Sequence, residues 1–546
     1  MEQTRFQIMR SFWEKYVWKY KINWAIALCL NIVFFAVSAM VPFIFRGVID
    51  SITSYGSIIN PWIIAFITIE GLQIILIYSK GYTSRILELK VQKDIKTLMY
   101  SKFYTASYLK SNQIKPGEAI QRITNDAASI RPLVVESFSE LVGHIILVII
   151  IIILMSILSP HLAVSSVFFI LIYTIGYKRY QKKASLLARD RQIASANFIS
   201  TLEEGFDANY SIRVQGAHRN ILKIFNKALE DFLTKGFDFY KLNLRFQGVF
   251  SALISYLTSA TVIIFGVWLI SRGLTTIGTL IAFSQYINWL VRFVAFMSNY
   301  ATQIEPSIVS LNRVEEILGW ETQWQLSKDR KAQGELENIS KNAVEFRNLD
   351  FSFDNNKIYN KLSFSIPRGK VTLIKGASGK GKTTLLNIML KIYAVENGTV
   401  AINGNDINSI HGRDIMSLIS VVEQEPKFFG DEITDSLSTF DNFSIDDLRS
   451  KSKLLGLDKF FDKIIKSTNK GKMKELSGGE RKRLGILRGL SRDTPIIIMD
   501  EPTAFIDDNT AKKILNKAFK LFPKKTFIII THDSSIEELA DFIIEI

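Results

Sequence analysis

The chain has 546 residues, a mass of 62.2 kDa and a formal net charge of +15. Its 30 glycines and 11 prolines exclude a collagen-like or low-complexity chain. The single cysteine, Cys29, excludes an intramolecular disulfide and a cysteine-based zinc cluster. A basic balance fits nucleic-acid binding, contact with anionic lipid, or a membrane protein with basic cytoplasmic loops. The position of the charge along the chain decides among these.

Six long apolar stretches lie before about residue 300. A helix needs ~20 predominantly apolar residues to cross the hydrocarbon core. The stretch 145–153 is a run of aliphatic residues that would be unusual in a soluble domain. The sequence therefore predicts a polytopic helical membrane domain. The predicted spans are 24–45, 59–79, 141–158, 162–177, 249–270 and 277–297.

The links between the predicted spans alternate in length and charge. The link 50–60 after span one and the link 159–161 after span three contain no Lys or Arg, and the link after span five contains only Arg272. The links after spans two and four are long, polar and basic, with a helical pattern and few helix breakers. Basic residues favour the cytoplasmic side. We expect both long links and both termini to be cytoplasmic, with helices that continue well past the membrane.

The first twenty residues mix aromatic and basic side chains and do not form a cleavable signal peptide. The segment 6–20 suits an amphipathic helix at the membrane interface, and an ordinary juxtamembrane flank is the alternative.

The composition changes near residue 320. We expect a transmembrane domain over 1–320, a polar linker over 321–340 and a soluble α/β domain over 341–546. Residues 1–340 hold 35 basic and 24 acidic residues, and residues 341–546 hold 32 and 28. Most of the excess charge therefore belongs to the membrane domain and its loops, which argues against a nucleic-acid partner.

A phosphate-binding loop follows the apolar strand 370–374. The segment fits G-x-x-x-x-G-K-[ST], with a strand before it and a helical stretch after it. Such a loop points successive N–H groups at a phosphate chain, beside the positive end of a helix. We expect Lys382 to reach the β and γ phosphates of ATP and Thr383 to bind Mg²⁺. The predicted ATP-binding residues of the loop are Gly376, Ala377, Ser378, Gly379, Lys380, Gly381, Lys382, Thr383 and Thr384.

Two carboxylates end another aliphatic strand, 496–499. Asp500 is placed to hold Mg²⁺, and Glu501 is placed to polarise the attacking water as a general base. The alternative is a strand that ends in two solvated acids.

Between these elements lies Leu476-Ser477-Gly478-Gly479-Glu480, which resembles the signature motif of ATP-binding cassette (ABC) proteins. The following Arg481-Lys482-Arg483 also fits that motif. With the phosphate loop before it and the acidic strand end after it, essentially the whole chain resembles a half-size ABC exporter. The resemblance implies a six-span exporter-type membrane domain followed by an α/β P-loop ABC ATPase.

The resemblance assigns further roles by position. Phe353 would stack on adenine, Gln424 would sense Mg²⁺ and water, and His532 would contact the γ phosphate. Asp507 matches the loop after the catalytic glutamate. Ala504 and Phe505 depart from the usual Ser-Ala-Leu-Asp of that loop, which affects the expected coupling across a dimer and leaves the ATP site intact.

In this family the signature motif completes the ATP site of the opposite subunit. The resemblance therefore implies that Ser477, Gly478, Gly479 and Asp507 act in trans, and that the chain works as a dimer. A homodimer is favoured because every catalytic element is present, and a heterodimer is the alternative. The segments 115–126 and 202–216 resemble the two regions that couple the ATPase domains to the spans.

Three ionisable residues fall within the predicted spans. Glu70, His144 and Arg292 are candidates to line a substrate path, because ionisable groups in a membrane are costly and usually functional. A structural pair of Glu70 with Arg292 is the alternative.

The resulting hypothesis is an ATP-driven exporter in a bacterial inner membrane, with ATP and Mg²⁺ bound. Its substrate would be a peptide, a drug-like molecule or a lipid, since exporters of all three share these motifs. Alternatives are an importer of exporter fold, an ATP-gated channel or regulator, and a soluble ATPase that acts on nucleic acid. The six spans argue against the last.

Overall fold

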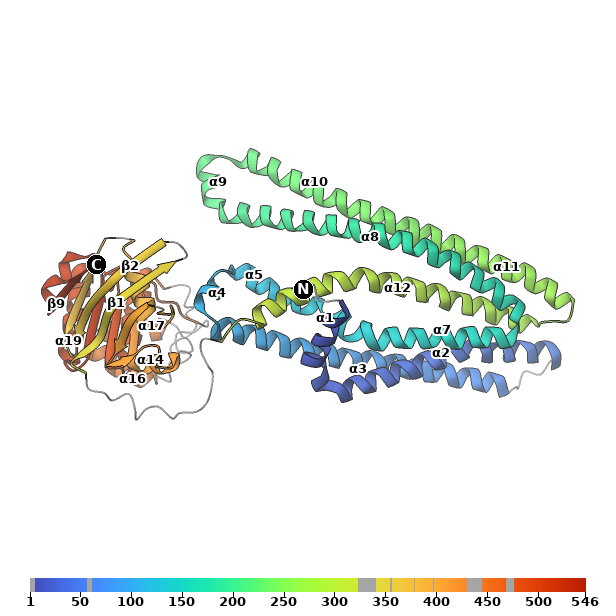
Figure 1. Cartoon of the computed structure of the whole chain (residues 1–546), viewed down its shortest axis with the longest axis horizontal. Helices are drawn as coiled ribbons and strands as arrows, with labels where there is room; N and C mark the ends of the chain where they lie inside the picture. The colour runs from blue at the N-terminus through green and yellow to red at the C-terminus, as the bar shows by residue number, and fades with distance from the viewer. Residues whose placement is uncertain are drawn as a thin grey trace. The chain divides into compact units, whose positions relative to one another are not determined.

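The computed structural model describes residues 5–55, 61–322, 340–353, 356–377, 379–395, 397–429, 444–467 and 476–546. The chain divides into two compact units. The first unit comprises Met1–Tyr100 and Pro116–Gly319, and the second comprises Ser101–Lys115 and Trp320–Ile546. The first is helical, and both β-sheets of the described chain lie in the second (Figure 1). Of the predicted linker, residues 323–339 lie outside the described residues.

Six helices of the described chain are long and apolar enough to cross a membrane. Each overlaps one of the predicted apolar stretches, so the six-span architecture is confirmed. Their apolar content explains this arrangement, because a helix satisfies all its main-chain polar groups internally and lipid offers none. The helices are α2 (Lys21–Tyr55), α3 (Pro61–Thr105), α7 (Leu141–Leu158), α8 (Pro160–Asp207), α11 (Ser251–Ser271) and α12 (Ile277–Leu318).

The two long polar links are helical, as predicted. The helix α3 runs for 45 residues and α8 for 48 residues. The helices α8 and α10 (His218–Asn243) form a long pair, with the short α9 (Asn209–Gln215) at its end (Figure 1). Gly216 adopts a left-handed conformation with φ 63° and ends α9, a position that glycine occupies without steric cost.

Residues 5–20 are helical, and several of their apolar side chains are buried in the protein, whereas Trp18 is exposed. They form α1 (Arg5–Phe12), the π-helical turn η1 (Trp13–Val17) and the 3₁₀ turn η2 (Trp18–Tyr20). Phe12 and Val17 are fully buried, and Trp13 donates from Nε1 to the carbonyl of Leu133 at 3.1 Å. Much of the apolar surface that suggested an interfacial helix is therefore covered by protein.

The end of α2 is fastened to the start of α12. The Asp50 carboxylate accepts hydrogen bonds from Gly278 N at 2.9 Å and from the Thr276 hydroxyl at 2.8 Å, and pairs with Arg46 at 3.1 Å. A Cβ on Gly278 would lie 2.6 Å from the Arg46 carbonyl oxygen, so only glycine fits this approach. Asp50 thus caps the N-terminus of a neighbouring helix, where negative charge is favoured.

The first predicted coupling region is a series of short helical turns. The Arg122 guanidinium binds Glu118 at 2.7 Å and Glu316 of α12 at 2.8 Å. The Ser310 hydroxyl of α12 donates to buried Asp126 at 3.0 Å. These contacts tie this region to the end of α12. The short helices of the membrane unit and its connections are α4 (Tyr108–Asn112), α5 (Pro116–Gln121), η3 (Arg122–Asp126), α6 (Ala127–Ser129), η4 (Pro132–Glu140) and η5 (Leu244–Phe250).

The second unit holds two sheets. An antiparallel sheet has the order β2-β1-β4-β5, and a parallel sheet has the order β6-β7-β8-β3-β9. The strands are β1 (Asn342–Phe353), β2 (Asn356–Pro367), β3 (Val371–Lys375), β4 (Asn397–Ile402), β5 (Asn405–Asp406), β6 (Ile419–Val422), β7 (Ile496–Asp500), β8 (Thr526–Ile530) and β9 (Phe542–Glu545). The helices are α13 (Lys382–Met389), α14 (Gly412–Leu418), α16 (Ile445–Leu455), α17 (Asp458–Ser467), α18 (Gly478–Ser491) and α19 (Asp508–Leu521), with the 3₁₀ turn η7 (Ser534–Leu539).

Both faces of the parallel sheet are buried, which explains its continuous apolar strands. On β7, Ile496 and Ile498 pack into a core shared with the antiparallel sheet and α13. Ile497 and Met499 face the opposite core, which α16, α17, α18 and α19 cover. The polar residues that follow β3, β6, β7 and β8 are thereby brought to the same edge of one rigid sheet, where open α/β sheets bind ligands.

Candidate functional site

The predicted phosphate loop follows β3 and leads into α13. Gly379 and Gly381 have φ values of 83° and 93°, which L side chains rarely adopt. A Cβ on Gly381 would lie 2.7 Å from the hydroxyl of buried Tyr359, which donates to the Gly381 carbonyl at 2.6 Å. The loop is therefore anchored from β2, and its last glycine caps α13.

Lys382 stands at the first turn of α13. Its ammonium donates to the carbonyls of Gly376 at 2.5 Å and Ala377 at 3.2 Å, so it folds across the loop that it is predicted to serve. Thr383 is exposed next to it, and Thr384 is buried. An exposed hydroxyl and an ammonium beside the N-terminus of a helix provide groups that bind phosphate.

Asp500 and Glu501 lie at the carboxyl end of β7, and both side chains are buried. Burial raises the pKa of Asp500, Glu501 raises it further, and Lys482 and Lys382 lower it. Glu501 has φ 44°, a left-handed conformation that costs a non-glycine residue about 1–3 kcal/mol and is common at functional sites. Its main-chain N–H donates to the Ile530 carbonyl at 2.8 Å, which holds it against β8.

Two residues after β8 hold the Glu501 carboxylate. The Thr531 hydroxyl donates to Oε2 at 2.8 Å, and His532 Nδ1 lies 2.7 Å from Oε1. Glu501 is buried, whereas His532 is exposed, so the histidine stands between the carboxylate and solvent. The structure thus brings together two residues that sequence motifs predicted separately. Thr531 was not predicted as a site residue, because a threonine in an apolar strand context has no distinguishing signal.

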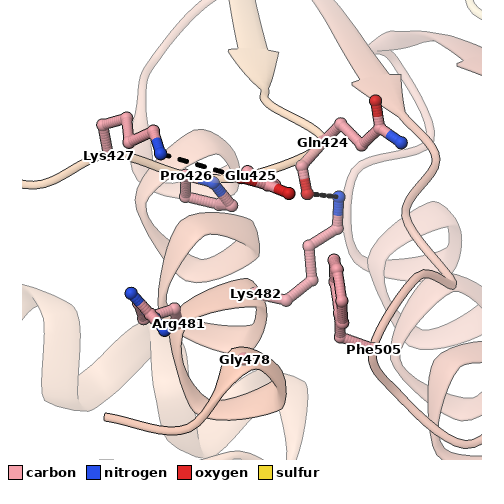
Figure 2. Close-up of a pocket in the computed structure, with 8 residues that line it drawn as sticks. All are labelled: Gln424, Glu425, Pro426, Lys427, Gly478, Arg481, Lys482 and Phe505. Carbon is pink, nitrogen blue, oxygen red and sulfur yellow. Dashed lines mark hydrogen bonds and ion pairs between the residues drawn. The ribbon is translucent and has the colours of Figure 1, made fainter. Parts of the chain in front are cut away.

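The predicted glutamine loop follows β6. Lys482 of α18 is fully buried and donates to the carbonyls of Glu423 at 2.9 Å, Gln424 at 3.1 Å and Asp500 at 2.9 Å. The amide end of Gln424 points away from Lys482 (Figure 2). Burial lowers the pKa of Lys482 to about 8, against the opposing effect of Asp500, Glu501 and Glu423.

A pocket of about 240 Å³ lies beside this lysine and not at the phosphate loop. Figure 2 shows it between the glutamine loop, the start of α18 and the Phe505 ring. Its lining residues are Gln424, Glu425, Pro426, Lys427, Gly478, Arg481, Lys482 and Phe505.

The predicted signature motif begins α18. Ser477 is the N-cap, and its hydroxyl accepts from Glu480 N at 3.2 Å while Glu480 accepts from Ser477 N at 3.0 Å. This reciprocal capping box fixes the first turn of the helix. Ser477 is exposed to solvent, and its hydroxyl also donates to the Glu480 carboxylate at 3.0 Å.

The loop after Glu501 packs on the signature motif of the same chain. Phe505 has φ 65° and an exposed ring. A Cβ on Gly478 would meet that ring at 3.4 Å, and a Cβ on Gly479 would lie 2.7 Å from the Phe505 carbonyl oxygen. Asp507 caps α19 by accepting from Thr510 N at 2.9 Å, and this hydrogen bond lowers the pKa of Asp507. Asp507 therefore has a structural role within the chain as well as its predicted role in trans.

The structure does not describe the side chains of two predicted ATP-binding residues. Phe353 ends β1, where its main chain pairs with Asn356, and its side chain lies outside the described part of the structure. Ser378 lies outside the described residues altogether.

The three ionisable residues of the spans lie on different helices. Glu70 of α3 is half-buried and Arg292 of α12 is exposed, with its guanidinium 5.4 Å from the Trp289 ring. Neither is in an ion pair within the described chain, so the suggested pairing of the two is not seen. His144 of α7 stacks on Phe296 at 3.9 Å and lies 4.3 Å from Phe35. Among these three, His144 is packed among aromatic rings, and Glu70 has no hydrogen bond or ion pair with any residue that the structure describes.

The donor atoms at the end of β7 and the start of α13 match those that Mg²⁺ prefers. The Asp500 carboxylate is buried without a hydrogen-bond donor among the described residues. A buried carboxylate with unused oxygens and an exposed threonine hydroxyl match the oxygen ligands that Mg²⁺ prefers, with phosphate and water completing the set. The residues therefore fit Mg²⁺. The described residues contain no cluster of three or more His, Cys, Asp or Glu that would bind a metal without the nucleotide.

Comparisons with known sequences match both parts of the chain. Residues 24–294 match the ABC transporter transmembrane region, and residues 359–504 match the ABC transporter ATPase family. An export ATP-binding/permease protein of Rickettsia typhi is 26% identical over 544 residues, covering 97% of this chain and 93% of the relative. The β-(1→2)glucan export ATP-binding/permease protein of Rhizobium johnstonii is 24% identical, covering 97% of this chain and 90% of the relative.

A solved structure has the same fold. A bacterial Atm1-family ABC exporter with ATP bound superposes with a TM-score of 0.79 at 18% identity, covering 96% of this chain and 93% of that chain.

Six apolar helices followed by a P-loop ATPase define an ATP-driven membrane transporter. The chain belongs to the ABC transporter family, and its arrangement is that of a half-size exporter. It binds ATP, couples ATP hydrolysis to transport, and is an integral membrane protein.

Proposed function

We propose that two identical copies of this chain export a substrate from the cytoplasm across a bacterial inner membrane. In this proposal residues 1–320 form the transmembrane domain, residues 341–546 form the ATPase, and both termini are cytoplasmic. The observation that carries it is the assembly of Glu501, Thr531 and His532 at the edge of the sheet that also bears the phosphate loop. The basic long links support this orientation.

Glu501 acts as the general base for the attacking water. Its two oxygens are held by Thr531 and His532, so the carboxylate keeps one orientation. A positioned general base contributes about 10²–10⁴ in rate. The exposed His532 is placed to reach the γ phosphate, and Lys382 is placed to exchange its loop carbonyls for the β and γ phosphates.

Mg²⁺ would be held by Asp500 and Thr383, with Gln424 nearby. When bound, the ion neutralises charge on the phosphate oxygens.

A second copy would complete each ATP site. The exposed Ser477 and the loop at Asp507 are the groups that act on the partner's nucleotide, and each chain carries a full catalytic set. ATP binding would close the two ATPase domains and bias the spans outward, and hydrolysis would release them. The substrate classes that fit are a peptide, a drug-like molecule or a lipid, and Glu70 is a candidate to line its path, as are His144 and Arg292.

The test is ATP hydrolysis in proteoliposomes across panels of peptides, dyes and lipids. Stimulation by one class, with ATP-dependent accumulation of that class inside inside-out vesicles, supports export. Glu501→Gln is the control, and we expect it to reduce hydrolysis by at least about 100-fold while ATP binding persists. Accumulation in right-side-out vesicles that contain ATP would contradict export and indicate import.

A further inference from the structure

Lys482 is a fully buried lysine whose ammonium donates to three main-chain carbonyls, with the acidic side chains of Asp500, Glu501 and Glu423 close enough to act on its charge. Its Nζ donates to Glu423, Gln424 and Asp500, at 2.9, 3.1 and 2.9 Å. An ammonium has three donors, so all of them are used. Lysine is almost never fully buried unless it is paired, because removing its charge from water is costly. The three carbonyls therefore compensate the buried charge of the Lys482 ammonium.

The three carbonyls lie where a pair of strands stops. The strands β6 and β7 are parallel neighbours, and the last pair in their register is Val422 with Met499. Glu423 and Asp500 are the next residues on each strand, and their carbonyls converge on Lys482. The ammonium therefore links the ends of the strands β6 and β7, one residue beyond the last pair of their register.

The helix that carries Lys482 is pressed against the same segment. A Cβ on Gly485 would lie 2.3 Å from Pro426, and a Cβ on Gly489 would lie 2.6 Å from Val422. The Ser420 hydroxyl donates to the Gly489 carbonyl at 2.7 Å. Positions 482, 485 and 489 share one face of the helix. The helix α18 therefore packs closely against residues 420–426, and Lys482 lies at the N-terminal end of this contact.

We propose that Lys482 is a positioning residue of the ATPase site, which fixes the main chain at Gln424 and Asp500 so that both side chains are placed for the nucleotide. The proposal rests on the ATPase function described above. Gln424 and Asp500 come from segments that no other described hydrogen bond joins beyond the strand ends. Without the ammonium, three buried carbonyls would lose a charged donor. Arg488 would still hold the Lys427 carbonyl at 3.0 Å, but the bridge from Gln424 to Asp500 through Lys482 would be lost.

The test compares substitutions in the full-length dimer. Lys482→Met keeps the length of the side chain and removes the donors, and Lys482→Arg keeps the charge. Lys525→Met is the matched control, because Lys525 donates to the Arg492 carbonyl at 2.8 Å, away from these three residues. We expect Lys482→Met to lower kcat by about tenfold or more with KM for ATP changed by less than about threefold. Lys482→Arg should recover part of the loss, and Lys525→Met should retain wild-type kcat.

A second readout does not depend on turnover. Hydrogen exchange of the nucleotide-free protein should be faster at residues 420–427 in Lys482→Met, and unchanged there in Lys525→Met. Wild-type kcat together with wild-type exchange in Lys482→Met would overturn the proposal. If Lys482→Met does not fold, Lys482→Leu, which also lacks N–H donors, is measured in the same way and by the same criteria.

The two proposals fail in different ways. Full hydrolysis by Glu501→Gln would contradict the catalytic assignment, whatever Lys482 does. Loss of hydrolysis in Glu501→Gln with normal kcat and exchange in Lys482→Met would overturn the role of Lys482 alone.

Discussion

At the scale of single residues, the carboxylate that we propose as the general base is held in place by its neighbours. Glu501 combines a left-handed main chain with two side-chain contacts, from Thr531 and His532. The strain at its φ angle is offset by the buried strands on either side, β7 and β8. The result is a base with a single orientation before any nucleotide arrives.

Thr531→Val tests this orientation. The substitution keeps the shape and removes the hydroxyl that donates to Glu501, and a hydrogen bond to a charged group contributes about 1.5–3 kcal/mol. We therefore expect kcat to fall by roughly tenfold or more, measured as steady-state ATP hydrolysis. Thr531→Ser keeps the donor and should stay close to wild type. A Thr531→Val protein with normal kcat would show that His532 orients Glu501 alone.

At the scale of elements, the membrane helices are joined by a few polar contacts within an apolar bundle. The cap that Asp50 of α2 places on α12 is one, and the contact of Arg122 with Glu316 is another. Each contact lies at the end of a helix. Asp50 accepts from an otherwise unsatisfied main-chain N–H of α12, and Arg122 pairs with the opposite charge of Glu316.

Asp50→Ala removes the cap on α12. Loss of a capping side chain costs about 1 kcal/mol, and here a paired Arg46 is also left without its carboxylate. We expect a lower midpoint of thermal unfolding in detergent. Thr53→Ala is the matched control, because the exposed Thr53 hydroxyl bonds only to carbonyls of its own helix. Equal midpoints for the two variants would contradict the capping role.

At the scale of the whole molecule, the proposed function distributes each ATP site between two copies. Gly478 and Gly479 of the signature motif pack against Phe505 in the same chain, so the signature motif and the loop after Glu501 lie side by side. A second chain that meets one of them must therefore meet both.

Mixed dimers test this arrangement. Wild-type and Glu501→Gln copies carrying different affinity tags should co-purify through two affinity steps. The wild-type copy keeps one site with an intact Glu501 and receives an intact signature motif from its partner, so we expect the mixed dimer to hydrolyse ATP at about half the wild-type rate or less. Two dimers of identical copies serve as controls. Failure to recover mixed dimers in the presence of ATP would contradict a homodimeric transporter.

The sequence predicts this molecule well where the signal is local. Hydropathy locates the six spans because each needs its own run of apolar residues, as in α7 at 141–158. The phosphate loop is readable because its glycines and Lys382 lie next to one another in the chain. The contacts of Lys482 and Thr531 are not readable, because their partners are carbonyls and carboxylates from other strands. The burial of Trp13 is equally hidden, since an aromatic face suits lipid and protein alike.

The length of α8 has a mechanical consequence. Its 48 residues span roughly 72 Å at 1.5 Å per residue, of which the hydrocarbon core takes ~30 Å. The remainder is a lever of roughly 40 Å, so a tilt of ~5° at the membrane surface moves its tip by roughly 3.5 Å. That displacement exceeds the length of a hydrogen bond. A rotation too small to disturb packing within the membrane is thus enough to make or break contacts at α9.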